Sequence, residues 1–308
     1  MKVVGVTGPD FMPHLIDIDE PTVPPDGVVV DVMAASVNDF DRAAVHGRYP
    51  NLTNPLLLGC DFVGRVAAVG EDVDYINVGM FVAGVAATQS LEHPGTFSER
   101  VAVRADSIAP VPDGVDPVQA AGVGLAGITA MSAVDALGAA DLGNLLIYGP
   151  VSGAGGFALQ LAKARGAVVA VVTPRAEAEL ARELGADVVI PEDGNPILAI
   201  QKARYGLDGQ VDTALHVAGD PALVAGVVRP GGKFTSVTGA ATKVARSDIE
   251  YRPTVVAPSG HKLADLLFKV ASRRLRSRVR RVVAFDEVTD AVDLFTTDTC
   301  GRTVLVCK

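Results

Sequence analysis

The stretch Leu145-Leu146-Ile147-Tyr148-Gly149-Pro150-Val151-Ser152-Gly153-Ala154-Gly155-Gly156 decides the fold of this chain. A short apolar run leads into a glycine-rich loop, and apolar side chains then recur at helical spacing over residues 154–162. A second apolar run follows at residues 168–172. Strand, glycine loop, helix and strand in this order predict a βαβ unit, whose loop places a pyrophosphate on a helix N-terminus. The loop residues predicted to bind this dinucleotide are Gly149, Ser152, Gly153, Ala154 and Gly155.

The end of the second predicted strand indicates which dinucleotide binds. About 20 residues beyond such a loop, proteins that bind an unmodified ribose carry an acidic residue. Thr173 and Arg175 stand there instead, and a hydroxyl and a guanidinium suit a 2′-phosphate. We therefore expect NADP(H) rather than NAD(H). Two alternatives stay open: the loop can be an ordinary tight turn, because Pro150 and Ser152 replace glycines of the G-x-G-x-x-G frame, and Arg175 can be a solvated surface residue.

Composition narrows the class of protein. The 308 residues suffice for two domains, and a net charge of −9 gives no electrostatic basis for binding nucleic acid. No run of 18 uncharged apolar residues is present, so we expect no membrane span, and the N-terminus lacks a signal-peptide pattern. The three cysteines (Cys60, Cys300 and Cys307) are too few and scattered for a disulfide framework or a four-thiolate zinc site. A reducing cytoplasm is the expected location.

The pattern of apolar runs predicts an α/β protein with two domains. Residues 1–115 are rich in turns, with predicted strands at 28–32, 62–69, 81–85 and 97–103. Six apolar runs then alternate with helical segments such as 176–185 and 221–228, which predicts a doubly wound parallel sheet, a Rossmann domain, over residues 116–258. The six predicted strands are 145–148, 168–172, 187–190, 211–217, 232–238 and 254–257.

The last fifty residues are too short to form a domain. They predict a helix at 262–273, a strand at 279–285, a helix at 286–295 and a strand at 303–306. We expect residues 259–308 to complete the β-rich domain of residues 1–115.

Several motifs, in order along the whole chain, give it a resemblance to a known family. They are Ala34–Asp41 (A-A-x-V-N-x-x-D), Leu58–Gly64 (P-G-x-D-x-x-G), Val66–Val82 (V-x-x-V-G…G-D-R-V), Gly95–Glu99 (G-[GT]-[FY]-[AS]-E), Gly127–Ala130 (G-x-T-A), Leu184–Asp187 (L-G-A-D) and Arg229–Gly232 (R-P-G-G). The chain thereby resembles the medium-chain dehydrogenase/reductase superfamily, specifically its zinc-free quinone oxidoreductase branch. The resemblance implies a GroES-like fold for the first domain. Met80-Phe81, Pro150 and Ser152 depart from the branch's pattern.

The resemblance also bears on metal. Zinc-dependent relatives hold a catalytic metal at places that here carry Asn38, Cys60 and, approximately, Gly122. One thiol with the adjacent Asp61 cannot close a tetrahedral site, so no metal is expected. Without a Lewis acid to stabilise an alkoxide, the feasible reaction is hydride delivery from NADPH to an electron-poor acceptor, a quinone or an activated C=C.

The resemblance implies that Asn38, Tyr49 and Thr129 lie beside the nicotinamide and its acceptor. Asn38 can instead satisfy loop backbone groups, Tyr49 can be structural, and Thr129 can be an N-cap. No general acid is expected, and His46 is expected at the surface. The predicted strand ends around Val217, Val237 and Gly239 are expected to contact the nicotinamide ribose and ring, although ordinary glycine turns explain them equally well.

The leading interpretation is a zinc-independent quinone oxidoreductase that uses NADPH and a small-molecule acceptor. An enoyl or enone reductase is the alternative within the enzymes, and a catalytically weak NADP(H)-binding sensor or structural protein is the alternative outside them. The segment 254–257 is a predicted edge strand of the Rossmann sheet. Because such an edge invites pairing with a second chain, we expect a homodimer built by continuation of the sheet.

Overall fold

The computed structural model describes residues 1–7, 12–48, 55–86, 95–138, 142–192, 209–238, 244, 246–288, 295 and 301–307. The chain divides into two compact units. The first unit contains residues 1–128 and 257–308, and the second unit contains residues 129–256. Across the described parts of the chain, no helix has the length and apolar character needed to cross a membrane.

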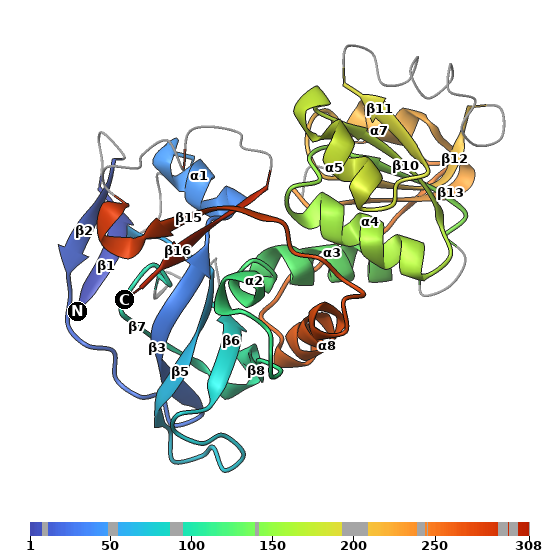
Figure 1. The fold of residues 1–308 in the computed structure, drawn as a ribbon. Helices are drawn as coiled ribbons and strands as arrows, with labels where there is room; N and C mark the ends of the chain where they lie inside the picture. The colour runs from blue at the N-terminus through green and yellow to red at the C-terminus, as the bar shows by residue number, and fades with distance from the viewer. Residues whose placement is uncertain are drawn as a thin grey trace. The chain divides into compact units, whose positions relative to one another are not determined.

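The second unit is built on a six-stranded parallel sheet in the order β11-β10-β9-β12-β13-β14. Strands β10, β11, β12 and β13 of this sheet are labelled in Figure 1. Its strands are β9 (Asn144–Tyr148), β10 (Val168–Thr173), β11 (Val188–Pro191), β12 (Val211–His216), β13 (Val228–Ser236) and β14 (Glu250–Tyr251). Numbered along the chain, this is the 3-2-1-4-5-6 order of a doubly wound sheet. Ligands of such sheets bind at the carboxyl ends of the strands, where the order reverses, which here is between β9 and β12.

Helices cover this sheet as expected for alternating β and α segments. Helix α4 (Ala154–Ala164) packs on β9 and β10, α5 (Ala178–Glu183) on β10 and β11, and α7 (Pro221–Gly226) on β12 and β13. The short 3-10 helix η2 (Arg175–Glu177) joins β10 to α5. The predicted Rossmann fold is therefore confirmed.

One predicted strand of the second unit is wrong. Residues 254–257 form no strand, and the edge of the sheet is instead β14, which pairs with β13. Pro253 and Pro258 flank the apolar run, and proline has no N–H to donate to a ladder. The side chains of Val255 and Val256 are 73% and 38% exposed in the single chain.

The first unit contains two sheets of mainly antiparallel strands. The larger one has seven strands, in the order β15-β16-β3-β5-β6-β8 with β7 also pairing with β3, and the smaller one has the order β2-β1-β4. The strands are β1 (Lys2–Val6), β2 (Pro13–Asp17), β3 (Gly27–Ser36), β4 (Leu56–Leu57), β5 (Asp61–Val69), β6 (Phe81–Val85), β7 (Arg100–Arg104), β8 (Ile108–Pro110), β15 (Val279–Ala284) and β16 (Arg302–Val306). The predicted strand 97–103 begins only at Arg100, because Ser98 forms no more than an isolated bridge to Val3.

The helices of the first unit are short apart from one. They are α1 (Asp39–Val45), α2 (Pro117–Ala121), α8 (Gly260–Ala271) and the 3-10 helices η1 (Ala105–Ser107) and η4 (Phe285–Glu287), while α3 (Gly124–Leu137) contains the boundary between the units. The C-terminal strand β16 pairs with β3, so the end of the chain returns to the first unit's sheet. Most of the predicted helix 286–295 lies outside the described residues.

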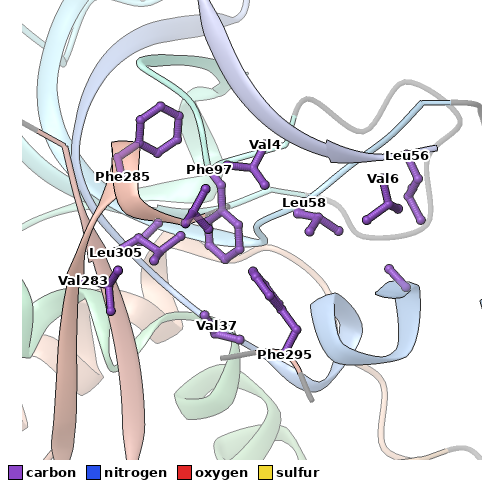
Figure 2. Packing of buried hydrophobic residues seen from close by; sticks show 13 residues of the cluster. Val4, Val6, Val37, Leu56, Leu58, Phe97, Val283, Phe285, Phe295 and Leu305 are labelled. Carbon is purple, nitrogen blue, oxygen red and sulfur yellow. The ribbon is translucent and has the colours of Figure 1, made fainter. Parts of the chain in front are cut away.

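A hydrophobic cluster fixes the end of β3 and the start of α1 in the first unit. Figure 2 shows Val37, Leu58 and Phe97 turned toward one another from three different segments. The rings of Phe97 and Phe295 pack with their centroids 6.4 Å apart. Val37 and Leu58 are 4% and 0% exposed, so the residues that follow them, Asn38 and Gly59, are held by a packed core.

Candidate active site

The glycine loop between β9 and α4 has the geometry of a phosphate cradle. Gly149 has φ +126°, and a Cβ there would lie 2.8 Å from the backbone nitrogen of Ala218. A Cβ at Gly155 would overlap the carbonyl oxygen of Pro150. The loop therefore folds tightly back on α4, and the first turn of that helix, from Ala154, presents N–H groups that have no intrahelical acceptor.

The end of β10 offers a buried hydroxyl beside this loop. The carbonyl of Val172 accepts a hydrogen bond from Gly149 N (2.8 Å), which joins the end of β10 to the start of the loop. The Oγ1 atom of Thr173, the next residue, is buried and has no hydrogen-bond partner. An unpaired buried hydroxyl costs about 1–3 kcal/mol, so this atom fits a group that receives a partner from a bound ligand. Arg175 lies two residues further on, exposed at the start of η2.

A carboxylate that the sequence did not reveal as a loop partner reaches into this region. Glu177 Oε2 accepts hydrogen bonds from the backbone N–H groups of Val151 (2.5 Å) and Ser152 (3.0 Å). Glu177 is only 6% exposed. A buried carboxylate thus stands four residues beyond the end of β10, in a 3-10 turn, and is bonded to the glycine loop.

A second carboxylate lies at the same edge of the sheet. Glu192 donates its backbone N–H to the carbonyl of Thr173 (2.8 Å), and its side chain accepts a hydrogen bond from the Tyr148 hydroxyl (2.5 Å). Burial first, and the Glu192 carboxylate second, raise the pKa of Tyr148 well above its usual range. Tyr148 thus stays protonated and holds Glu192 against the carboxyl end of β9.

The ends of β12 and β13 are joined through His216, a residue that sequence reasoning missed. Its Nε2 lies 3.1 Å from the carbonyl oxygen of Gly219, which can only accept, so Nε2 carries the hydrogen. Its Nδ1 then accepts from the Ser236 hydroxyl at 2.9 Å. Burial lowers the pKa of His216, in agreement with this neutral form. The imidazole therefore orders two strand ends at the ligand-binding edge.

The predicted residues that follow β12 and β13 lie at this edge as well. Val217 N donates to the carbonyl of Tyr148 (2.8 Å), and the Val217 side chain packs against Gly149 of the loop. Val237 N donates to the carbonyl of His216 (3.1 Å). Gly239 lies outside the described residues. The structure thus brings Val217 to the loop, and Val237 to the neighbouring strand end.

In the first unit, Asn38 belongs to a buried polar network. Its amide nitrogen donates to the carbonyl of Ser36 (3.0 Å) and to Asp61 Oδ2 (3.1 Å), and its amide oxygen accepts from Arg302 (2.9 Å). Arg302 also donates to the Ser36 hydroxyl and lies 3.6 Å from Asp61 Oδ2. Both amide hydrogens of Asn38 therefore have acceptors inside the protein.

The Asp61 carboxylate sits at the N-terminus of α3. It accepts from the backbone N–H of Leu125 (3.1 Å), and only a glycine at position 124 leaves room for it there. The positive end of the helix and the guanidinium of Arg302 both attract its negative charge. No feature of the sequence indicates the partnership with Arg302, which comes from β16.

Asp41 and Cys60 complete the surroundings of Asn38. Asp41 accepts from the backbone N–H groups of Asn38 (2.8 Å) and Gly59 (2.7 Å), yet burial raises its pKa to about 7. Burial also raises the pKa of the Cys60 thiol, with the charges of Asp41 and Asp61 adding to the effect. Among the residues that the structure describes, no three His, Cys, Asp or Glu side chains are grouped so as to hold a metal ion.

The remaining predicted residues are placed only in part. Thr129 lies half-buried within α3, five residues after its first residue Gly124, so the N-cap alternative for Thr129 is excluded. Tyr49 lies outside the described residues. His46 is exposed at the end of α1, and its Nδ1 contacts the carbonyl of Arg42 (2.7 Å), as expected of a surface residue.

Comparison with known families finds two models that match along the chain. The alcohol dehydrogenase GroES-like domain matches residues 24–113. The zinc-binding dehydrogenase model matches residues 153–266, which begin at the last residue of the glycine loop and include the helix that follows it.

Similar proteins include a polyketide synthase subunit and several oxidoreductases. A region of a phenolphthiocerol/phthiocerol polyketide synthase of Mycobacterium tuberculosis is 31% identical over 68% of this chain and 9% of that protein. The NADPH-dependent alkenal/one oxidoreductase of Arabidopsis thaliana chloroplasts is 30% identical over 76% of this chain and 61% of that protein. The chain thus spans less than two thirds of the length of either relative. Among solved structures, a quinone oxidoreductase from Coxiella burnetii superposes with a TM-score of 0.84 at 24% identity, over 100% of this chain and 99% of that one.

Proposed function

Because the chain belongs to the medium-chain dehydrogenase/reductase superfamily of NAD(P)-binding oxidoreductases and carries the motifs of its quinone-oxidoreductase-like branch, we propose that it reduces a quinone or a similar electron-poor acceptor with NADPH. The observation that carries the proposal is the cradle in the second unit. The tight loop at Gly149 and Gly155 and the unpartnered Thr173 hydroxyl beside it fit the phosphates and ribose of a dinucleotide.

The preference for NADP(H) is supported by the end of β10. Thr173 and Arg175 provide a hydroxyl and a guanidinium, and a charge-assisted hydrogen bond from arginine to a phosphate is among the strong ones. The alkenal/one oxidoreductase that resembles this chain is named as NADPH-dependent. We place the 2′-phosphate at these two residues.

The reduced nicotinamide, when bound, supplies a hydride, and the protein's task is to hold it and to exclude competing groups. The first turn of α4 binds the pyrophosphate, and the strand ends at Val217, Val237 and Gly239 contact the nicotinamide end. Asn38, Tyr49 and Thr129 are the proposed contacts to the nicotinamide and the acceptor. Since both Asn38 amide hydrogens have acceptors within the network, its contribution is to orient the site, and it donates to an acceptor's oxygen only after one of those bonds breaks.

Zinc independence is part of the proposal. The place that carries a metal in zinc-dependent relatives holds Asn38, whose amide oxygen is bonded to Arg302, and Cys60, whose thiol is buried with a raised pKa. An amide and a protonated thiol are poor ligands for zinc, which prefers thiolates and imidazoles.

Reduction of a conjugated C=C is the second candidate, and one specific relative favours it. The Arabidopsis protein matches 76% of this chain and is named for its action on alkenals and alkenones. Hydride delivery to an enone uses the same cofactor and needs the same kind of support for a developing oxyanion.

The test is a screen of NADPH oxidation with quinones, enones and enoyl thioesters as acceptors. The reaction is monitored by the loss of nicotinamide absorbance. The proposal predicts turnover with at least one quinone, and faster turnover with enones would favour the second candidate. Tight NADPH binding without oxidation by any of these acceptors would contradict both, and would favour a sensor or structural protein.

A homodimer in the cytoplasm completes the proposal. Val255 and Val256 are exposed in a segment of the second unit that follows the edge strand β14. Exposed apolar side chains beside a sheet edge favour pairing with a second copy of the chain.

A further inference from the structure

The Glu177 carboxylate occupies donors of the kind that a phosphate would use. Both N–H groups that it receives, from Val151 and Ser152, belong to the glycine loop and directly precede the N-cap of α4 at Gly153. Successive backbone N–H groups in such a loop form an anion-binding concavity. At 6% exposure, Glu177 is held there as a resident anion of the protein.

Its carboxylate lies between the glycine loop and the segment that follows β10, the region where doubly wound folds contact the adenosine ribose. The loop is tied to the end of β10 by the hydrogen bond from Gly149 N to the Val172 carbonyl, and Glu177 bridges from beyond that strand end back to the loop. In doubly wound folds, the group that contacts the ribose 2′ position stands at the end of this second strand, while the pyrophosphate lies at the helix N-terminus.

The charge at this place is dominated by acids. Glu192 is bonded through its backbone to Thr173, and its carboxylate lies one strand away, on the Tyr148 hydroxyl. Arg175 is the only cation in the segment 173–177, which the structure describes in full. A 2′-phosphate brought to Thr173 would therefore meet the Arg175 guanidinium and the Glu177 carboxylate, while the Glu192 carboxylate is held on the neighbouring strand by Tyr148.

We propose that Glu177 is a specificity-determining residue that opposes the 2′-phosphate. It keeps the N–H groups of Val151 and Ser152, leaves those of the α4 first turn to the pyrophosphate, and accepts a hydrogen bond from an unmodified 2′-hydroxyl. Arg175 favours NADPH and Glu177 favours NADH, and the balance between them sets the cofactor range. This inference rests on the proposed dinucleotide site, but not on the identity of the acceptor.

The test compares four ligands in Glu177→Gln, a variant that keeps the side chain's shape and removes its charge. Dissociation constants are measured by calorimetry for NADPH and NADH, and for the fragments 2′,5′-ADP and 5′-ADP. We expect binding of NADPH and 2′,5′-ADP to tighten by about 10-fold, with NADH and 5′-ADP changing by less than about threefold in either direction. The matched control is Glu179→Gln, at a position two residues after Glu177. It removes an exposed carboxylate that pairs with Arg182, and it should change all four dissociation constants by less than about twofold.

A second variant protects the test against misfolding. If Glu177→Gln melts well below the wild-type protein, Glu192→Gln neutralises the other carboxylate from an exposed position, and we expect a smaller gain, about threefold, confined to the two 2′-phosphorylated ligands.

Several outcomes would overturn the inference. If all four ligands bind more tightly to Glu177→Gln by the same factor, Glu177 competes with any phosphate for the loop N–H groups. If all four bind more weakly by the same factor, Glu177 only supports the structure of the loop. NADH binding with no selective gain for NADPH would contradict this inference alone. Failure of the wild-type protein and both variants to bind any of the four ligands would contradict the proposed function itself, and this inference with it.

Discussion

Removal of the buried guanidinium from the Asn38 network should destabilise the first unit severely. Arg302 has a side-chain exposure of 6%, donates to Asn38 Oδ1 (2.9 Å) and Ser36, and neutralises Asp61, which is fully buried. Arg302→Met keeps most of the side chain's volume but leaves the Asp61 carboxylate without its cation. Breaking a buried pair in this way costs about 3–5 kcal/mol, which is a large part of the total stability of about 5–15 kcal/mol of a typical domain.

The matched control is Arg100, which makes more ion pairs than Arg302 but has a more solvent-exposed side chain. Arg100 lies 2.7 Å from Asp31 and 3.1 Å from Glu20, yet its side chain is 44% exposed. Arg100→Met should cost less than about 1 kcal/mol, because exposed pairs are screened by water. The contrast separates burial from the number of ion pairs.

The assay is urea unfolding followed by circular dichroism, fitted to the transition of the first unit. The double variant Arg302→Met/Asp61→Asn should be more stable than Arg302→Met alone, since it removes the uncompensated charge. Equal costs for the Arg302 and Arg100 variants, or a double variant less stable than the single one, would show that Arg302 does not compensate a buried charge.

Four further predictions concern cofactor, metal, assembly and pH. Arg175→Ala should weaken NADPH binding by about 10–100-fold and leave NADH within about twofold, because a charge-assisted bond contributes roughly 1.5–3 kcal/mol; equal losses for the two cofactors in calorimetry would contradict the assignment of the 2′-phosphate. Purified protein should contain less than about one zinc per ten chains, and chelators should leave its activity unchanged, since Cys60 lacks the partners of a zinc site among the described residues; stoichiometric zinc by elemental analysis would overturn this. Val256→Asp should shift the sedimentation of the protein from dimer toward monomer while cofactor binding persists, because it places a charge in the exposed apolar segment proposed to pair; a wild-type monomer at micromolar concentration would exclude the dimer. The pKa of Asp41 in the folded protein, about 7, lies above its usual value of 3.8, so the native state holds a proton that the unfolded state releases. The free energy of unfolding should therefore fall as pH rises from about 4 to about 7, by up to about 4 kcal/mol. Asp41→Asn should flatten this pH dependence in thermal melts; an unchanged pH dependence would show that Asp41 is ionised in the native protein.

The glycine loop and most of the parallel sheet could be predicted from the sequence because they are local. Alternating apolar runs identify β9 to β12, and the glycines at 149 and 155 mark a loop that has no room for a Cβ. The edge strand could not be found in the same way. The apolar segment 254–257 has the composition of a strand, but two prolines flank it, and Glu250–Tyr251 pair instead.

The partners within the candidate site were the least predictable part. Arg302 meets Asn38 across 264 residues of sequence, and no local pattern encodes that contact. Glu177 reaches the loop only because the 3-10 helix η2, which follows β10, directs its side chain back toward the loop. The sequence pattern instead expects an acidic residue at the end of the strand itself. His216 has the sequence context of an ordinary residue in an apolar strand, and its role depends on the register that brings it beside Ser236.

The proposed reaction is the transfer of a hydride from bound NADPH to an electron-poor acceptor without a metal. A single-turnover experiment tests it directly. Protein dialysed against EDTA is loaded with one equivalent of NADPH, mixed with an excess of a quinone, and followed by nicotinamide absorbance. The bound NADPH should be oxidised at the same rate with and without EDTA treatment. Persistence of the bound NADPH in the presence of both quinone and enone, or oxidation that EDTA abolishes and zinc restores, would contradict it.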